Sequence, residues 1–300
     1  MFISNTDIPA AARKTSAGLP CRDPFILAYG GMYYLYHSAG PAGIACSVSG
    51  DLETWSAPAL VYRRPADFHG VKDWFWAPEC HYWKGKFYIF TSVFSAKYNH
   101  RCISVYRADG PLGPFEDIAG GCVTVPTWDT IDGTLYVDEQ GDPWLVFVHE
   151  WTCMPDRNGG MAAARLSEDF THLVSEPIQL FLARDPAWVT NGVTDGPFLY
   201  RTEGGKLYMI WSNFGKDGYA VTQAVSESGK IEGPWKHAES PLYARGMRPE
   251  WTDDGGHAMI FKRNDGQWML SFHSPNSHNP KFERVTFLPI SLDENGVTIL

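Results

Sequence analysis

The sequence lacks any run of apolar residues close to the roughly 20 needed to span a bilayer. Its opening residues, MFISNTDIPAAARKTSAGLP, contain no apolar core of signal-peptide length. Basic residues are also scarce, since 25 Lys and Arg stand against 34 Asp and Glu and the formal net charge is −9. An acidic chain is a poor partner for phosphate backbones and anionic membranes. We therefore predict a cytoplasmic protein that binds neither nucleic acid nor membrane.

Cysteine pairs and several familiar enzyme motifs are absent as well. The six cysteines are irregularly spaced without a C-x-x-C pair, which excludes zinc ribbons and thioredoxin chemistry and predicts reduced, buried thiols. The sequence has no H-E-x-x-H pair, no G-x-S-x-G elbow, no P-loop and no G-x-G-x-x-G loop. Zinc proteases of that type, serine hydrolases with that elbow and the nucleotide-binding folds are therefore set aside.

Aromatic residues make up 14% of the chain and recur in register. Five aromatic-rich runs follow turn residues at intervals of roughly 54 to 63 residues, a spacing suited to a multi-strand blade. They are Gly31-MYYLYHS, Gly85-KFYIFTS, Asp142-PWLVFVH, Gly205-KLYMIWS and Gly266-QWMLSFH. Their apolar residues occupy successive rather than alternate positions, which indicates strands covered on both faces, as in stacked sheets.

A short strand and a turn precede each run, so each pair predicts a β-hairpin. Further strand-like pieces, such as GIACSVS and RCISVYR, bring the unit to four strands. Because no composition shift marks a linker, we predict an all-β chain that forms one five-bladed β-propeller over residues 21–300, after an N-terminal segment 1–20. The alternative is a β-sandwich, which would not require a fivefold register.

Acidic residues stand at the start of four units, and the fifth unit supplies a histidine. They are Asp23 in CRDPF, Glu79 in WAPEC, Asp132 in TIDGT, Asp195 in VTDGP and His257 in GGHA. If these segments line a central channel, the acids meet near one axis and raise one another's pKa, as in many active sites. Any single Asp before Gly or Pro is explained as a turn residue, but the recurrence favours catalysis.

In order and spacing these motifs resemble those of glycoside hydrolase family 43, five-bladed propeller enzymes that cleave arabinose- and xylose-containing plant polysaccharides. The resemblance covers nearly the whole chain. It implies that Asp23 is the general base, that Asp132 orients the acid and tunes its pKa, and that Asp195 is the general acid of an inverting hydrolysis. Since the family usually has Glu at the acid position, Glu150 is the alternative proton donor.

A sugar site needs flat aromatic surfaces and a few fixed polar groups. The predicted substrate-binding residues are Arg22, Trp76, Glu79, Glu150 and Trp151. Trp74 and Trp128 are further candidate platforms, although any one tryptophan of an aromatic-rich propeller is more often part of the core. Trp76 is the strongest candidate because it directly precedes a segment expected to face the channel.

The same resemblance makes His257 a candidate ligand for calcium or another cation in the central channel. An ordinary hydrogen-bonded histidine is the equal alternative, and His149 is a weaker candidate still. We expect that no cofactor is required.

The expected partner is an oligosaccharide substrate, and the expected activity is that of an exo-acting α-L-arabinofuranosidase or β-xylosidase that works on short imported chains. The linkage, exo or endo action and the oligomeric state stay open. A retaining fructosidase similar to family 32 ranks behind, because RDP lies in the wrong blade and no N-D-P-N-G nucleophile is present. A non-catalytic sugar-binding propeller is the alternative from another class, and turnover of a nitrophenyl arabinofuranoside distinguishes it from an enzyme.

Overall fold

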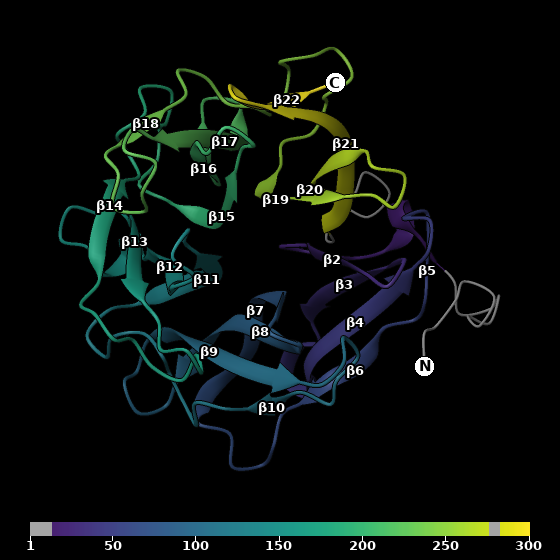
Figure 1. Cartoon of the computed structure of the whole chain (residues 1–300), viewed down its shortest axis with the longest axis vertical. Coiled ribbons are helices and arrows are strands. Elements are labelled where there is room, and N and C mark those ends of the chain that lie inside the picture. The colour runs from purple at the N-terminus through teal and green to yellow at the C-terminus, as the bar shows by residue number, and fades with distance from the viewer. Residues whose placement is uncertain (1–13, 276–282) are drawn as a thin grey trace.

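The computed structural model describes residues 14–275 and 283–300, without the side chains of residues 17 and 71–74. In this part of the chain, five antiparallel sheets of four strands each surround a common axis (Figure 1). Helical structure within these ranges is confined to three 3-10 turns, at Ser16–Gly18 (η3), Gly40–Ala42 (η4) and Trp151–Cys153 (η5). None of them is long and apolar enough to cross a membrane. The predicted all-β, five-bladed propeller is confirmed.

Each blade is one sheet whose strands follow one another along the chain. Blade 1 contains β2 (Phe25–Tyr29), β3 (Met32–Ser38), β4 (Gly43–Ser49) and β6 (Ala59–Arg63). Blade 2 contains β7 (Gly70–Trp83), β8 (Lys86–Ser95), β9 (Arg101–Ala108) and β10 (Glu116–Asp117). Blade 3 contains β11 (Thr130–Val137), β12 (Pro143–His149), β13 (Gly160–Arg165) and β14 (Ile178–Leu182). Blade 4 contains β15 (Asp195–Arg201), β16 (Leu207–Gly215), β17 (Gly218–Ser226) and β18 (Trp235–His237). Blade 5 contains β19 (Gly256–Lys262), β20 (Trp268–Pro275), β21 (Glu283–Asp293) and β22 (Gly296–Ile299).

The first strands of the blades, β2, β7, β11, β15 and β19, lie nearest the axis (Figure 1). Each pairs with the following strand, so all five predicted hairpins are present. The strand β7 is 14 residues long, and Trp76 lies within it rather than in a loop before it.

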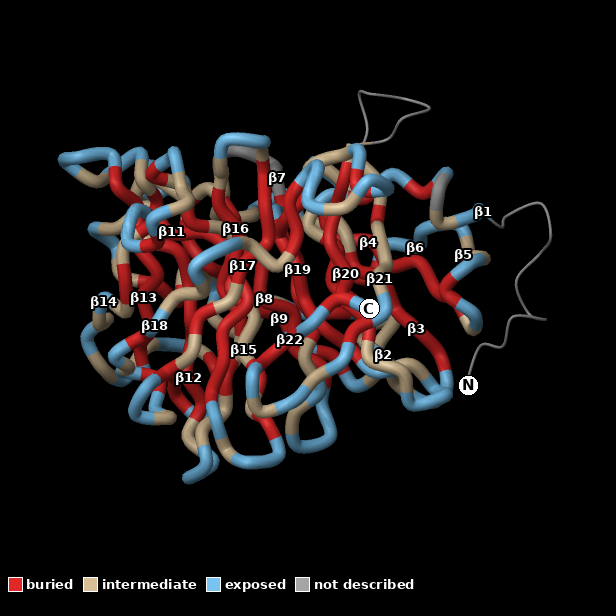
Figure 2. Tube along the Cα trace, turned by 90° about the horizontal axis from the view of Figure 1, so that it is seen from above, coloured by how far each residue is buried: buried red, intermediate tan, exposed pale blue. Residues whose placement is uncertain are grey.

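The hydrophobic core lies between neighbouring blades, which explains the unbroken aromatic runs. In β3, four successive residues from Tyr33 to Tyr36 are at most 3% exposed. Tyr34 and Tyr36 pack in a cluster with blade 2, whereas Tyr33 and Leu35 pack in another with blade 5. Both faces of the sheet are therefore covered, and exposed residues concentrate in the loops at the two ends of the blades (Figure 2).

The ring closes between blades 1 and 5 through packing and hydrogen bonds, since in the described ranges each blade keeps its own four strands. The chain before β2 runs along β21, where the amide of Cys21 donates to the carbonyl of Glu283 (2.9 Å). A buried cluster joins the two blades and includes Leu19, Phe25, Leu35, Trp55, Met259, Phe261 and Val285. A short ladder between β1 (Lys14–Thr15) and β5 (Thr54–Trp55) holds the segment before it. The division at residues 20 and 21 stays a prediction.

Two cysteines contradict the prediction of reduced thiols. Cys102 on β9 and Cys122, which follows β10, form a disulfide with their Cα atoms 5.6 Å apart. Their separation of 20 residues hides the pair in the sequence, because only the return of the chain along β9 brings them together. The other four cysteines are free: Cys21, Cys46 and Cys80 are buried as predicted, and Cys153 is exposed.

Candidate active site

A cavity of about 780 Å³ receives residues from all five blades. Its lining includes Asp23, Trp76, Asp132, Asp195 and His257, one from each blade. This volume lies in the roughly 300–1,000 Å³ range of small-molecule sites. Segments far apart in the sequence therefore meet at one place that can enclose a small ligand.

A left-handed backbone residue occurs in or just before the first strand of every blade, and in blade 2 it lies midway along β7. The five are Asp23 (φ 52°), Ala77 (φ 44°), Asp132 (φ 53°), Gly196 (φ 52°) and His257 (φ 53°). In blades 2 to 5 this residue lies at a register shift between the first two strands. The conformation costs a non-glycine residue about 1–2 kcal/mol, and bulges of this kind redirect side chains next to functional sites. The repeated distortion places four of these residues in the cavity wall.

Side chains of the preceding blade fix three of these positions. The backbone amides donate as follows: Asp132 to Oγ of Ser92 (2.9 Å), His257 to Oγ of Ser212 (2.8 Å) and Asp23 to Nδ1 of His273 (3.1 Å). Because the blades form a ring, the blade that precedes blade 1 is blade 5. His273 thus has the role at blade 1 that serine has at two other blades.

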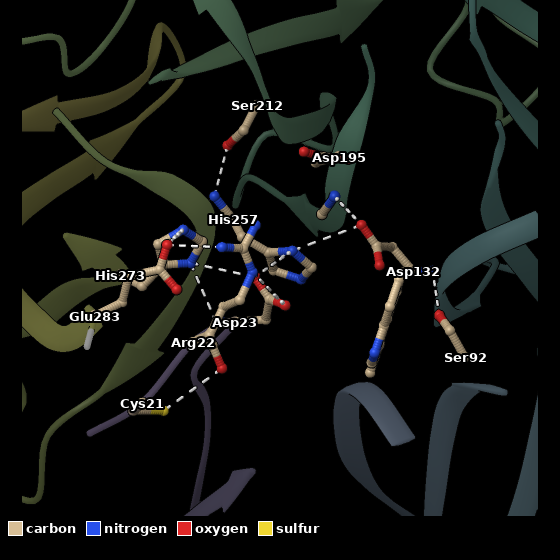
Figure 3. Close-up of polar contacts among 12 residues, drawn as sticks. Cys21, Arg22, Asp23, Ser92, Asp132, Asp195, Ser212, His257, His273 and Glu283 are labelled. Atoms are coloured by element: carbon tan, nitrogen blue, oxygen red, sulfur yellow. Dashed lines mark hydrogen bonds and ion pairs between the residues drawn. The ribbon is translucent and has the colours of Figure 1, made fainter. Parts of the chain in front are cut away.

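The imidazole of His257 lies between two of the predicted catalytic carboxylates (Figure 3). Its Nδ1 is 3.2 Å from Oδ1 of Asp23 and 3.6 Å from Oδ2 of Asp132. The ring fits only because residue 196 is glycine, since a Cβ there would lie 2.8 Å from the imidazole. Asp23 and Asp132 are therefore brought together, as the sequence predicts.

The predicted cation stays a prediction. Among residues 14–275 and 283–300, no group of three or more His, Cys, Asp and Glu side chains is arranged to hold a metal ion. The Nδ1 of His257 faces two carboxylates, which is the environment of a hydrogen-bonded histidine. No reaction step below uses a cation.

Asp23 lies in a polar network that favours its charged form. Its Oδ1 is 3.2 Å from Nδ1 of His273, and the Nε of Arg22 is 3.7 Å from its Oδ2. Arg22 also donates from Nη1 to Oε1 of Glu283 (2.6 Å). Burial alone would raise the pKa of Asp23, but the facing His257, and after it Arg22, outweigh the effect of burial. The pKa of Asp23 therefore lies well below its usual range.

The pKa of Asp195 is shifted in the opposite direction. Burial, and after it the charge of Asp132, raises the pKa of Asp195 to about 7. Its Oδ2 accepts a hydrogen bond from the hydroxyl of Tyr219 (2.9 Å). Burial and the charge of Asp23 also raise the pKa of Asp132, against the stabilising amide of Gly196, which donates to its Oδ2 (3.0 Å). A carboxyl group with a pKa near 7 can give up a proton at neutral pH.

The Asp-Gly pairs at 132–133 and 195–196 are not equivalent in the structure. In blade 3 the aspartate takes the left-handed position, whereas in blade 4 the glycine takes it. Asp195 therefore reaches the cavity from one residue earlier, as the first residue of β15. Glu79 differs too, because the left-handed residue of blade 2 is Ala77.

The substrate-binding candidates divide into two groups. Arg22, Trp76, Glu150 and Trp151 line the cavity. Glu79 is absent from its described wall, and its buried carboxylate faces Nε2 of His81 at 3.1 Å. Glu150 caps η5, where its Oε2 accepts from the amide (3.3 Å) and the hydroxyl (2.8 Å) of Thr152.

The candidate tryptophans also differ in their surroundings. Trp76 is 36% exposed, and the guanidinium of Arg101 lies 4.5 Å from its ring centroid. Arg157 lies 5.4 Å from the ring of Trp151. Trp128 instead stacks on His149 at 3.9 Å and packs against a hydrophobic cluster. The side chain of Trp74 lies outside the described part of the chain.

Two residues that contact the predicted catalytic aspartates, His273 and Tyr219, are not among the residues predicted from the sequence. A signal for His273 exists, because a serine or histidine occupies the last position of all five aromatic runs, QWMLSFH included. Tyr219 begins an ordinary strand run, YAVTQAV, and nothing in that pattern marks it.

Comparison with known proteins gives matches over nearly the whole chain. The family model described as Glycosyl hydrolases family 43 matches residues 19–298. An endo-arabinase structure from Bacteroides thetaiotaomicron VPI-5482 is 38% identical, with a TM-score of 0.82 over 93% of this chain and 97% of that one. The extracellular exo-alpha-(1->5)-L-arabinofuranosidase ArbA of Cellvibrio japonicus is 25% identical over 91% of this chain and 84% of its own length. The extracellular endo-alpha-(1->5)-L-arabinanase 1 of Bacillus subtilis is 24% identical over 79% of this chain and 76% of its own.

These relatives correct the predicted localisation. The arabinofuranosidase and the arabinanase named above are both described as extracellular, which contradicts the prediction of a cytoplasmic protein. That prediction rested on the composition of the first residues, and the disulfide between Cys102 and Cys122 also disagrees with it, since such bonds persist in oxidising compartments.

Proposed function

The chain belongs to glycoside hydrolase family 43 and is a glycosidase of arabinose- or xylose-containing polymers, and from this premise we propose that it hydrolyses α-1,5-linked arabinan. The names of the relatives favour arabinose over xylose. We also propose that the protein works outside the cell. The ground for preferring exo action, work on short imported chains, is lost with the cytoplasmic prediction, and the end products of arabinan hydrolysis will decide between exo and endo action.

One arrangement carries the proposed mechanism: Asp23 and Asp195 line the same cavity, and their different neighbours shift the pKa values of the two carboxyl groups in opposite directions. Asp23 is kept ionised by its cationic and polar neighbours and serves as general base. Asp195, with a pKa of about 7, remains partly protonated at neutral pH and serves as general acid. Environments that push two pKa values apart separate the roles of base and acid.

Hydrolysis then proceeds in one displacement. A water molecule attacks the anomeric carbon and gives a proton to Asp23, while the bond to the glycosidic oxygen breaks and that oxygen takes the proton of Asp195. The products are a reducing sugar of inverted configuration and the alcohol of the leaving chain. Asp132 contributes through its charge, which raises the pKa of Asp195 and so favours the protonated form of this acid.

We prefer Asp195 over Glu150 as the acid. The Oε2 of Glu150 already accepts two hydrogen bonds from Thr152 as the cap of η5, a structural role. Asp195 has the raised pKa that the step needs. Its side chain is one methylene shorter than the usual glutamate, and its anchoring by Tyr219 fixes where the carboxyl group lies.

The test measures hydrolysis of linear arabinan, arabinotriose and the 4-nitrophenyl glycosides of arabinofuranose and xylose. We expect turnover of the arabinose substrates and, by proton NMR, initial release of the inverted anomer. Asp23→Asn and Asp195→Asn should each lower kcat on arabinotriose by roughly 10²–10⁴-fold. Asp109→Asn is the matched control, because Asp109 is exposed and pairs with Lys86 away from the cavity. Sugar binding without turnover in the wild type would instead establish a non-catalytic binding protein.

A further inference from the structure

Tyr219 belongs to β17, the third strand of blade 4, yet it contacts both the proposed acid and the histidine that supports the proposed base. Its side chain is buried, and its hydroxyl donates to Oδ2 of Asp195 (2.9 Å). Its ring stacks on the imidazole of His273, with centroids 5.6 Å apart and planes 26° apart. His273 in turn holds the backbone of Asp23. One aromatic side chain thus contacts the proposed acid and the support of the proposed base.

The surrounding chain holds this tyrosine firmly in place. Its amide donates to Oδ2 of Asp254 (3.0 Å), and its carbonyl accepts from the amide of Gly255 (3.1 Å). The ring also packs against Phe214, with centroids 4.8 Å apart. A Cβ on Gly256 would lie 2.2 Å from Cε1 of the ring, so only glycine leaves room for it. The hydroxyl therefore has a defined position relative to Asp195.

We propose that Tyr219 is a positioning residue that keeps Oδ2 of Asp195 an acceptor and thereby directs the acidic proton onto Oδ1, a role that rests on the acid function proposed for Asp195. A protonated carboxyl group has one hydroxyl oxygen and one acceptor oxygen. Because the phenol donates to Oδ2, the proton of Asp195 resides on Oδ1. That proton passes to the glycosidic oxygen as the bond to the anomeric carbon breaks.

The same hydrogen bond strengthens as the reaction proceeds. When Asp195 loses its proton, the neutral contact becomes charge-assisted, which is about twice as strong. Tyr219 thus favours the ionised form of Asp195 and lowers its pKa, against burial and the like charges of Asp132 and Asp23. The facing His257 acts in the same direction as Tyr219. The acid is consequently kept within reach of neutral pH.

Tyr219 itself stays protonated across the working pH range. Burial, and then the charges of Asp195, Asp23 and Asp132, raise its pKa well above the usual value for tyrosine. The charge of Arg22 on the side of the base and the ring of His273 complete its polar surroundings. The phenol is therefore a permanent donor rather than a second acid.

The experiment compares Tyr219→Phe with the wild type on two substrates that differ in leaving group. Arabinotriose needs a proton on its leaving oxygen, whereas a 4-nitrophenolate departs almost unaided. Loss of a hydrogen bond to a charged group predicts a kcat on arabinotriose lower by roughly 10- to 100-fold. For 4-nitrophenyl α-L-arabinofuranoside we expect less than about a threefold loss, with KM of both substrates nearly unchanged.

The pH profile supplies a second readout that a purely structural role would not move. Removing a donor that favours the ionised form raises the pKa of Asp195, so the alkaline limb of kcat/KM moves to higher pH in Tyr219→Phe. Tyr243→Phe is the matched control. This substitution also removes a hydroxyl that donates a hydrogen bond, but the acceptor is the backbone carbonyl of Asp253 (2.7 Å) and not the proposed acid.

Equal losses on the two substrates, or an alkaline limb that stays in place, would overturn the role of Tyr219. If Tyr219→Phe is unfolded by thermal melting, Gly256→Ala provides the second variant, because it keeps the phenol but displaces its ring. Failure of both variants to fold would show a structural residue and also overturn the proposal. A wild type inactive on every arabinoside would instead defeat the proposed function itself, which this comparison distinguishes.

Discussion

Asp132→Asn offers a direct test of how the acid is kept protonated. In the wild type, burial is the larger cause of the raised pKa of Asp195, and the charge of Asp132 is the next. The substitution removes that charge but retains an oxygen that can accept from the amide of Gly196. We therefore expect the pKa of Asp195 to fall from about 7 while burial still holds it above the usual 3.8.

The size of the shift follows from electrostatics. A like charge close by commonly moves a carboxyl pKa by about 1–3 units, and one unit corresponds to about 1.4 kcal/mol. An acid must be protonated to act, so kcat/KM falls about tenfold for each pH unit above its pKa. If the pKa of Asp195 falls by one unit, kcat/KM should fall by about a further tenfold at pH 8 and should hardly change for this reason at pH 5.

The assay is kcat/KM for arabinotriose between pH 4 and pH 9, measured by released reducing ends. Asp109→Asn, which removes an exposed carboxylate paired with Lys86, should leave the profile unchanged. If the alkaline limb of the kcat/KM profile of Asp132→Asn lies at the same pH as in the wild type, or at a higher pH, Asp132 is not the charge that keeps Asp195 protonated.

Other expected outcomes concern stability and binding. Gly196→Ala places a Cβ 2.8 Å from the ring of His257 at a left-handed φ of 52°, so we expect roughly 1–3 kcal/mol of destabilisation, measured by chemical denaturation. Cys102→Ser opens the loop closed by Cys122 and should lower stability by about 2–4 kcal/mol; an unchanged melting temperature, with and without reductant, would contradict this. Trp76→Ala should raise KM for arabinotriose by roughly 3- to 10-fold with kcat preserved, because stacking on sugar is lost; an equal fall in kcat would argue against a platform.

The fold could be predicted because the apolar pattern that produces a blade is repeated along the sequence. Each aromatic run buries successive side chains against two neighbouring blades, so an unusual apolar pattern recurs five times. The gathering of Asp23, Asp132 and Asp195 in one cavity followed from the same repetition. Their roles remain predictions that the variants above will test.

Other features could not be predicted because they depend on three-dimensional detail. The one-residue offset of Asp195 depends on whether Asp or Gly takes the left-handed position, and that choice is decided by the nearby ring of His257. The hydroxyl of Tyr219 on β17 reaches Asp195 on β15 across the intervening strand β16, and no local sequence pattern indicates this contact. The disulfide likewise forms only because the chain after β10 returns along β9 and brings Cys122 next to Cys102.

The junction between the first and last blades also holds the proposed base. Asp23 belongs to blade 1, yet His273 and His257, which fix and face it, belong to blade 5. In the described chain these blades share no continuous strand ladder and are joined by side-chain packing, individual hydrogen bonds and an isolated bridge between Pro20 and Arg284. A slight separation of blades 1 and 5 would move Asp23 away from His257 and His273 while every four-stranded sheet stayed intact. Catalysis should therefore fade in mild denaturant earlier than circular dichroism reports any loss of strand.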